Sequence, residues 1–200
     1  MLDTLIIGGG AAGLSCALVL GSAREKEFAK GKNIAIITHQ KTSHLQTALF
    51  NNVLGLQPGT LGTDILKDGK KQLAELYPHI LQIEKEKVTQ IERQQDHFKV
   101  TTNKSSYESK IVVVAVGYTD LITIKGLDDF IEPHPRAAIE KSRIWLKNTD
   151  HLIEKDLYVA GTLAGWRSQF AMASGSGAHV ATDILTLWNG GKHTKIHDKI

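Results

Sequence analysis

The hydrophobic pattern at the start of the chain is a short apolar run, a glycine-rich turn and a second, longer apolar run. Residues 5–7 (LII) predict a buried strand, residues 8–10 (GGG) predict a turn, and the apolar stretch that continues to Ala23 predicts a helix. Residues 33–38 (NIAIIT) and 111–116 (IVVVAV) are solid aliphatic runs. Such runs are typical of parallel strands that are covered on both faces. The pattern therefore predicts an α/β protein with a parallel sheet.

The segments between these strands are more polar. Residues 63–77 predict an amphipathic helix, with Thr63 or Asp64 as N-cap and apolar residues spaced along one face. Residues 41–62 form a long irregular segment whose interspersed apolar side chains indicate an ordered loop, and ordered loops of this length are usually functional. Short alternating stretches predict a hairpin-like series of strands at residues 80–83, 87–93, 97–102 and 106–109.

Two further helices are expected near the C-terminus. Residues 137–146 (AAIEKSRIWL) predict a short amphipathic helix, which could cover a hole left in the surface or form a subunit contact. The last helix is expected to begin near Arg167 and Gln169. It contains the small residues 174–178 (SGSGA), which allow a close approach to another backbone or to a cofactor.

The spacing Gly8-x-Gly10-x-x-Gly13 after a strand and before a helix is the dinucleotide fingerprint. Gly8 permits the sharp turn, Gly10 permits the approach of a pyrophosphate, and Gly13 permits close packing of the helix on the strand. The N–H groups at the start of the helix, where Ala11 and Ala12 lie, then face the phosphates. The second strand ends in Thr38, His39 and Gln40, without the carboxylate that commonly holds the adenosine ribose of NAD.

Composition and charge narrow the function further. The net charge is +3 and no dense basic run is present, so we expect no nucleic-acid partner. Glycines interrupt the apolar N-terminal stretch and no basic segment precedes it, so we expect neither a signal peptide nor a membrane anchor but a cytoplasmic protein. Cys16 is the single cysteine and is expected to be a core residue, which excludes a C-x-x-C redox pair within the chain.

We predict no metal site. The nine histidines are scattered along the sequence, and only His193 and His197 have the spacing of ligands on one helix face. Two ligands do not complete a usual metal site, so residues 191–200 are better interpreted as a polar, solvated tail.

Four stretches carry a resemblance to a known family. They are the fingerprint at residues 8–13, residues 52–62 (NVLGLQPGTLG), residues 114–117 (VAVG) at the end of a buried strand, and residues 156–185 (DLYVAG … RSQF … GSG …). In this order they resemble the FAD-binding domain of the thioredoxin reductase-like branch of the pyridine nucleotide-disulfide oxidoreductases. The resemblance implies a Rossmann-like parallel sheet with helices on both faces, a small antiparallel β-meander, and FAD held across the C-terminal ends of the strands.

The same resemblance implies a set of cofactor-binding residues. Among them, Gln169 and the backbone of Phe170 would meet the isoalloxazine ring, and Thr162 would face the ribityl chain. The whole set expected to bind FAD is Gly8, Gly10, Ala11, Ala12, Gly13, Thr38, His39, Gln40, Asn52, Val88, Ala115, Gly117, Gly161, Thr162, Gln169 and Phe170.

The chain departs from the family in three ways. Residues 118–155 are too short to hold the inserted NAD(P)H domain, the C-x-x-C pair is missing, and Thr162 stands where the family has an aspartate. We therefore expect a single FAD-binding domain over residues 1–190, with a shortened connection at 118–155. A self-contained disulfide reductase is excluded, and no catalytic side chain is assigned.

The resemblance leaves two functions open. The first is an FAD-dependent oxidoreductase, expected to form a homodimer, that receives electrons from transiently bound NAD(P)H or from a protein redox partner. The second is a non-catalytic FAD-binding module that acts as a sensor, a scaffold or a subunit of a larger flavoenzyme. Binding of NAD at the fingerprint is less favoured, because no acid follows Thr38.

Overall fold

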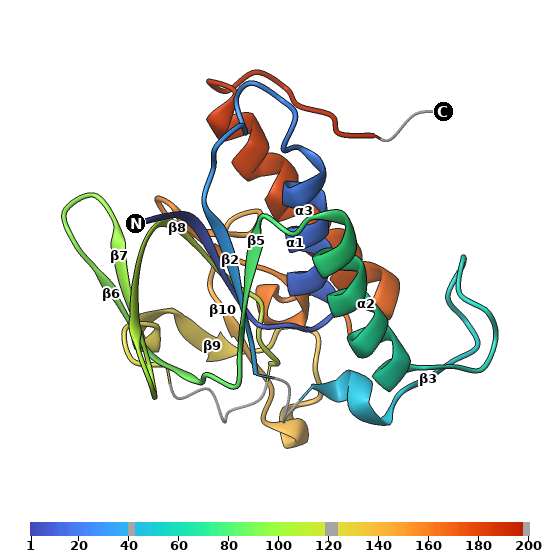
Figure 1. Cartoon of the computed structure of the whole chain (residues 1–200). Coiled ribbons are helices and arrows are strands. Elements are labelled where there is room, and N and C mark those ends of the chain that lie inside the picture. The colour runs from blue at the N-terminus through green and yellow to red at the C-terminus, as the bar shows by residue number, and fades with distance from the viewer. Residues whose placement is uncertain (40–42, 119–123, 198–200) are drawn as a thin grey trace.

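One mixed β-sheet forms the centre of the molecule, and different layers cover its two faces (Figure 1). The computed structural model describes residues 1–39, 43–118 and 124–197, so the predicted site residue Gln40 lies outside the described residues. The five parallel strands are ordered β5–β2–β1–β8–β12, and β11 pairs antiparallel at the β12 edge. The strand bounds are β1 Leu2–Ile7, β2 Ile34–Thr38, β5 Ile80–Glu84, β8 Ser106–Val114, β11 Leu152–Glu154 and β12 Leu157–Val159.

The central strand β1 marks the point at which the strand order reverses. Ile7 at its end pairs with Ile37 of β2 on one side and with Val114 of β8 on the other. The strand that follows β1 in sequence, β2, therefore lies on one side of it, and the later strand β8 lies on the other side. In open α/β sheets, ligands bind outside the carboxyl ends of the strands at such a switch point.

Three α-helices cover one face of the sheet: α1 (Ala11–Ser22), α2 (Gly62–Leu76) and α3 (Phe170–Trp188). The helices α1 and α3 pack at very short range, because a Cβ on Gly177 would lie 1.9 Å from the carbonyl oxygen of Ala12. This confirms that small residues in the last helix permit a close backbone approach. Within the described parts of the chain, no helix is long and apolar enough to cross a membrane.

The opposite face is covered mainly by the antiparallel meander of β6 (Val88–Arg93), β7 (Phe98–Thr102) and the first half of β8. Burial alternates along β7, so Phe98 and Val100 turn their side chains into the core beneath the sheet. The predicted α/β class with a meander is confirmed. The layer on this face, however, is built from the meander and residues 124–146, whereas α1, α2 and α3 lie on the other face (Figure 1).

Two strand predictions need correction. The expected strands at residues 106–109 and 111–116 are one continuous strand, β8, which ends at Val114. Its exposed first half pairs with β7 and its buried second half lies between β1 and β12. The change from half-exposed to fully buried residues therefore marks the point where β8 exchanges one neighbouring strand for two others, and the strand itself is not broken. In addition, β5 does not belong to the hairpin series, since it pairs parallel with β2.

The helix predicted at residues 137–146 is wrong. A single 3₁₀ turn, Ile139–Lys141, is followed by strand β10 (Ile144–Leu146), which pairs antiparallel with β9 (Ile131–Pro133). Ser142 has φ 45° and ends the turn, and Ile139 is exposed instead of lying on an apolar face. The β-branched and aromatic residues that follow Ser142 favour a strand over a helix.

The helix predicted at residues 63–77 is present as α2, but it begins at Gly62, and neither Thr63 nor Asp64 is its N-cap. Close packing fixes this start, because a Cβ on Gly62 would lie 2.0 Å from the carbonyl oxygen of Leu45. The preceding irregular segment holds the 3₁₀ turn His44–Thr47 and a small hairpin of β3 (Leu49–Phe50) and β4 (Thr60–Leu61).

The described part of the expected tail is only partly solvated. His193 and His197 are exposed and lie on irregular chain, so they do not share a helix face. Between them, Thr194 is buried and Ile196 packs against the core beneath the helices. Residues 194–196 are therefore anchored to the helical layer.

Candidate functional site

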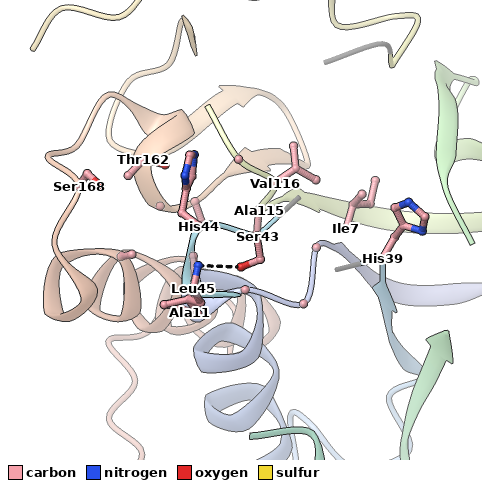
Figure 2. A pocket seen from close by; sticks show the side chains of 18 of the residues that line it. Ile7, Ala11, His39, Ser43, His44, Leu45, Ala115, Val116, Thr162 and Ser168 are labelled. Carbon is pink, nitrogen blue, oxygen red and sulfur yellow. Dashed lines mark hydrogen bonds between the residues drawn. The ribbon is translucent and has the colours of Figure 1, made fainter. Parts of the chain in front are cut away.

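A cleft of about 700 Å³ opens at the switch point of the sheet (Figure 2). Its floor is formed by the ends of β1 and β8, and its walls come from segments far apart in the sequence. Most of the residues predicted to bind a cofactor line this cleft, namely Gly8, Gly10, Ala11, Ala12, His39, Val88, Ala115, Gly117, Gly161, Thr162, Gln169 and Phe170.

The three fingerprint glycines do different work. Gly8 has φ +120°, and a Cβ there would lie 2.3 Å from the carbonyl oxygen of Ala115. A Cβ on Gly13 would lie 1.8 Å from the carbonyl oxygen of Gly8. By contrast, the nearest atom to a Cβ on Gly10 is the hydroxyl oxygen of Ser43, at 4.0 Å. The predicted roles of Gly8 in the turn and of Gly13 in packing are thus confirmed, while Gly10 leaves space open in the cleft.

Two helix N-termini meet at the cleft. Gly10 is the N-cap of α1 and Gln169 is the N-cap of α3, and neither helix has a side-chain cap or an acidic residue in its first turn. The backbone N–H groups of a first turn have no partner within the helix, and they carry the positive end of the helix dipole. The electrostatics of the cleft therefore favour an anionic or electron-rich ligand near both helices.

The wall beyond β2 contains His39 and residues 86–88. Glu86 supplies the carboxylate that the sequence lacks at the end of β2, although it comes from the segment before β6. Its Oε2 atom accepts hydrogen bonds from the Thr102 hydroxyl at 2.7 Å and from the Tyr107 hydroxyl at 3.0 Å. These bonds hold the carboxylate in a fixed position at the edge of the cleft.

The wall near Thr162 is supported by a row of aromatic rings. His44 lies at the cleft, its ring contacts Tyr118 at 5.6 Å, and Tyr118 contacts His134 at 5.4 Å. The backbone N–H of Arg136 donates to His134 Nδ1 at 3.1 Å, so Nε2 carries the proton and donates to the carbonyl oxygen of Thr162 at 3.1 Å. The connection at residues 124–146 thereby fixes the backbone of Thr162.

A cation lies behind this row. The guanidinium of Arg143 stands over the Tyr118 ring at 4.9 Å. Burial, and secondarily the charge of Arg143, lower the pKa of His44. His44 is therefore neutral at physiological pH and presents an uncharged ring to the cleft (Figure 2).

The small hairpin closes the cleft on the side of α3. Phe50 of β3 and Phe170 at the start of α3 both line the cleft, and their rings lie 5.2 Å apart. Ser168 and Thr162 lie on one side of the glycine turn, and His39 lies on the other (Figure 2). A ligand that filled the cleft would therefore span from α3, past the start of α1, to the end of β2.

Three predicted residues do not line the cleft. Gly13 lies behind the turn, where it packs on Gly8. Thr38 is buried, and its hydroxyl donates to the carbonyl oxygen of Ile83 at 3.5 Å. Asn52 is exposed in the loop between β3 and β4 and does not reach the cleft.

Sequence reasoning also missed several lining residues. For those in the irregular segment 41–62, the only signal was the apolar content of that segment. The missed polar and aromatic residues are Ser43, His44, Phe50, Glu86, Lys87 and Ser168.

Solved structures with the same fold include an oxidoreductase from Agrobacterium tumefaciens, with 16% identity, 92% of this chain and 97% of that chain covered, and a TM-score of 0.71. A thioredoxin reductase from Gloeobacter violaceus is 13% identical, with 99% of this chain and 98% of that chain covered and a TM-score of 0.73. A ferredoxin-flavin thioredoxin reductase from Clostridium acetobutylicum is 17% identical, with 94% of this chain and 98% of that chain covered and a TM-score of 0.68. At these identities the likeness establishes the fold.

A search of curated proteins finds no match. The family model described as pyridine nucleotide-disulphide oxidoreductase matches residues 2–162, which include the glycine turn, the meander and the start of the 3₁₀ turn after β12. By this match, which extends over most of its length, the chain belongs to the pyridine nucleotide-disulphide oxidoreductase family.

Proposed function

We propose that the cleft binds FAD and that the protein is a flavin-dependent oxidoreductase. The observation that carries this proposal is the meeting of two uncapped helix N-termini at one cleft beside the switch point of the sheet. The cleft volume of about 700 Å³ lies within the usual range for ligand sites. Membership of the family supports a nucleotide cofactor, and several proteins with the same fold are named thioredoxin reductases.

The lining residues suggest one orientation of the ligand. The pyrophosphate would lie against Gly10 and the first turn of α1, where backbone N–H groups point outward. The adenosine would extend toward His39 and Glu86, and the fixed carboxylate of Glu86 would accept a hydrogen bond from a ribose hydroxyl. The flavin ring would then lie near Thr162 and Gln169.

The contribution of the protein is positioning and electrostatics. A bound flavin supplies the electron chemistry itself. The N-terminus of α3 would stabilise negative charge on a ligand beside Gln169 and Phe170. The support of Thr162 by His134 keeps this part of the wall in a fixed geometry.

Flavin binding is tested by an absorbance spectrum of the purified protein and by thermal melting with added FAD. A ligand present at a hundredfold excess over its Kd stabilises the fold by about 2.7 kcal/mol, which raises the melting temperature by several degrees. NAD⁺ added at the same excess serves as the control ligand. Protein that contains no flavin, and whose melting temperature FAD does not raise, would overturn the proposal.

A non-catalytic FAD-binding module remains the second candidate function. It is favoured by one observation: Cys16, the single cysteine, is buried and lies outside the lining of the cleft, so the chain has no redox thiol there. Anaerobic mixing with NADH and with NADPH separates the two functions. Rapid bleaching of the flavin absorbance supports an enzyme that accepts hydride from transiently bound NAD(P)H, whereas no bleaching supports a module or a donor protein.

The assembly and location of the protein are further parts of the proposal. We propose a homodimer that exchanges electrons with a protein redox partner, and sedimentation of the purified protein tests its oligomeric state. A cytoplasmic location is supported by the lack of any second cysteine that could form an internal disulfide.

A further inference from the structure

A cluster of two histidines and two aspartates lies outside the cleft, between a turn and the middle of α3. Asp150 and His151 belong to the turn that precedes β11, and His179 and Asp183 lie one helical turn apart on α3. His179 Nε2 lies 3.3 Å from Asp183 Oδ2 and 3.5 Å from Asp150 Oδ1. His151 Nδ1 lies 3.7 Å from the same Asp150 oxygen.

His151 provides the buried wall of this cluster. It is only 1% exposed, and its ring stacks on His179 with the ring centroids 4.8 Å apart. Its Nδ1 atom has no hydrogen-bond partner, although it points toward the Asp150 carboxylate. A buried polar atom without a partner is destabilising, and a ligand bound to this nitrogen would remove that cost.

The spacing of these atoms is close to that of the ligand atoms around a tetrahedral metal ion. Zinc binds imidazole nitrogen and carboxylate oxygen at roughly 2.0–2.2 Å, so two ligand atoms in a tetrahedral site lie about 3.3–3.6 Å apart. The separations from His179 Nε2 to Asp183 Oδ2 and to Asp150 Oδ1, 3.3 and 3.5 Å, lie in this range, and the 3.7 Å between His151 Nδ1 and Asp150 Oδ1 is slightly longer. The ligand atoms of Asp150, His151 and His179 all lie within 4.8 Å of one another.

We propose that Asp150, His151 and His179, with Asp183 as a fourth ligand, form a binding site for a divalent transition-metal ion of the zinc class. Two imidazoles and two carboxylates are a donor set that suits such ions. The two carboxylates balance the charge of the ion. His179 and both aspartates are partly exposed, so the ion can enter from solvent.

Ser176 contacts the ring nitrogen of His151 that faces away from the cluster. The Nε2 atom of His151 lies 2.8 Å from the Ser176 hydroxyl oxygen, which also accepts the backbone N–H of Gly161 at 2.7 Å. When Nε2–H donates to Ser176, Nδ1 is left unprotonated and directed at the cluster, as in most metal-bound histidines.

The site is distinct from the proposed flavin cleft, because none of its four proposed ligands lines the cleft. Ser176 nevertheless connects the two, since Gly161 belongs to the cleft wall. Binding of a metal would fix the His151 tautomer and, through Ser176, the backbone position of Gly161.

Titration calorimetry with Zn²⁺ on the EDTA-treated, flavin-free chain of residues 1–200 tests the site. We expect one ion per chain, and we expect His179→Gln and Asp150→Asn each to weaken binding at least tenfold. Both side chains are partly exposed, so both variants should fold, which far-UV circular dichroism checks. His193→Gln is the matched control, since His193 is exposed and lies outside the cluster.

The tautomer of His151 provides a second readout. On addition of Zn²⁺, a long-range ¹H–¹⁵N spectrum should show a metal-bound Nδ1 and a protonated Nε2 for this buried ring, and Co²⁺ should give the visible absorption of a tetrahedral site. The proposal is overturned if Zn²⁺ does not bind stoichiometrically, or if it binds both cluster variants as tightly as the control. These measurements contain no flavin, so their outcome does not depend on whether FAD binds the cleft.

Discussion

A Cβ atom on Gly13 would lie 1.8 Å from the carbonyl oxygen of Gly8, so helix α1 meets the end of β1 backbone against backbone. Gly10 lies between these two residues, and a Cβ there would have no atom nearer than 4.0 Å. Its φ of −85° is accessible to alanine. The turn and the first turn of α1 thus contain two glycines that the fold requires and one at which a side chain would enter the cleft.

We expect Gly13→Ala and Gly10→Ala to have opposite phenotypes. Gly13→Ala forces the backbones apart and should lower the free energy of unfolding by about 2–3 kcal/mol. Gly10→Ala should unfold like the parent protein but bind FAD at least tenfold more weakly, because the methyl group displaces the phosphate. Urea unfolding and FAD titration measure the two effects. Equal FAD affinity of Gly10→Ala and the parent protein would show that the pyrophosphate does not bind at this turn.

A second glycine pair in α3 tests the packing of the helical layer. Gly177→Ala places a methyl group where the Ala12 carbonyl lies 1.9 Å away, and we expect a loss of about 2–3 kcal/mol. Gly175 is exposed with nothing near its Cβ position, so Gly175→Ala should stabilise the helix by up to about 1 kcal/mol. Thermal melting compares the two variants, and destabilisation by both would contradict the described orientation of α3.

Asp3 is a buried carboxylate that ties β1 to its neighbours. It accepts the backbone N–H of Asn33 at 2.9 Å and the Lys110 ammonium at 3.0 Å. Burial alone would raise the pKa of Asp3, but these hydrogen bonds and the nearby charges of Lys110 and Lys32 hold it below its usual value.

The lowered pKa of Asp3 predicts a pH-dependent stability. A carboxyl whose folded pKa is depressed stabilises the protein above its unfolded pKa of about 3.9, and this stabilisation is lost as the pH falls through the folded value. We expect Asp3→Asn to cost about 1–2 kcal/mol at pH 7 and clearly less near pH 3. Urea unfolding at both pH values measures this difference. A constant difference would show that the carboxylate charge does not contribute.

Cys16 is expected to be chemically inert in the folded protein. Its side chain is fully buried in α1, and burial raises the pKa of its thiol, so almost no thiolate forms at neutral pH. Iodoacetamide should therefore leave the native protein unmodified for hours and alkylate it rapidly in urea, as followed by mass spectrometry. Fast alkylation without denaturant would contradict the packing of α1.

The proposed position of the flavin predicts the effect of a charge at residue 162. Thr162→Asp provides a charge-assisted acceptor in place of a neutral one, which is worth on the order of 1 kcal/mol, or about fivefold in Kd. We expect FAD to bind more tightly, while the ligand-free protein loses stability because a carboxylate enters the half-buried wall. Thr162→Val is the control and should weaken binding. An unchanged affinity in both variants would place the ribityl chain elsewhere.

The sequence was sufficient to predict the elements that local patterns determine. Residues 5–13 fix a strand, a turn and a helix in sequence order, and solid aliphatic runs identified the buried strands. The walls of the cleft could not be predicted, because tertiary packing brings Ser43, Phe50 and Glu86 to the glycine turn. The cluster of His151 and His179 could not be predicted for the same reason, because the two rings become neighbours only through the packing of α3.

Errors in the sequence prediction also have a common physical origin. Residues 137–146 have helical periodicity, but the partner strand β9 decides their structure. Lys110 separates a polar stretch from an apolar run without interrupting β8, because an exposed side chain is tolerated wherever one face of the strand is open. Hydrophobic periodicity predicts which side chains are buried, but it does not predict which neighbouring strand or helix covers them.

Ser109 pairs with Leu2 of β1 and also with Phe98 of β7, so the parallel sheet and the meander meet at one residue of β8. Neither layer can slide past the other without breaking this shared ladder. The side of the cleft that contains Val88 is therefore held in register with its floor. We expect any widening that admits a ligand on the opposite side, where the described contact is the packing of the Phe50 ring on the Phe170 ring.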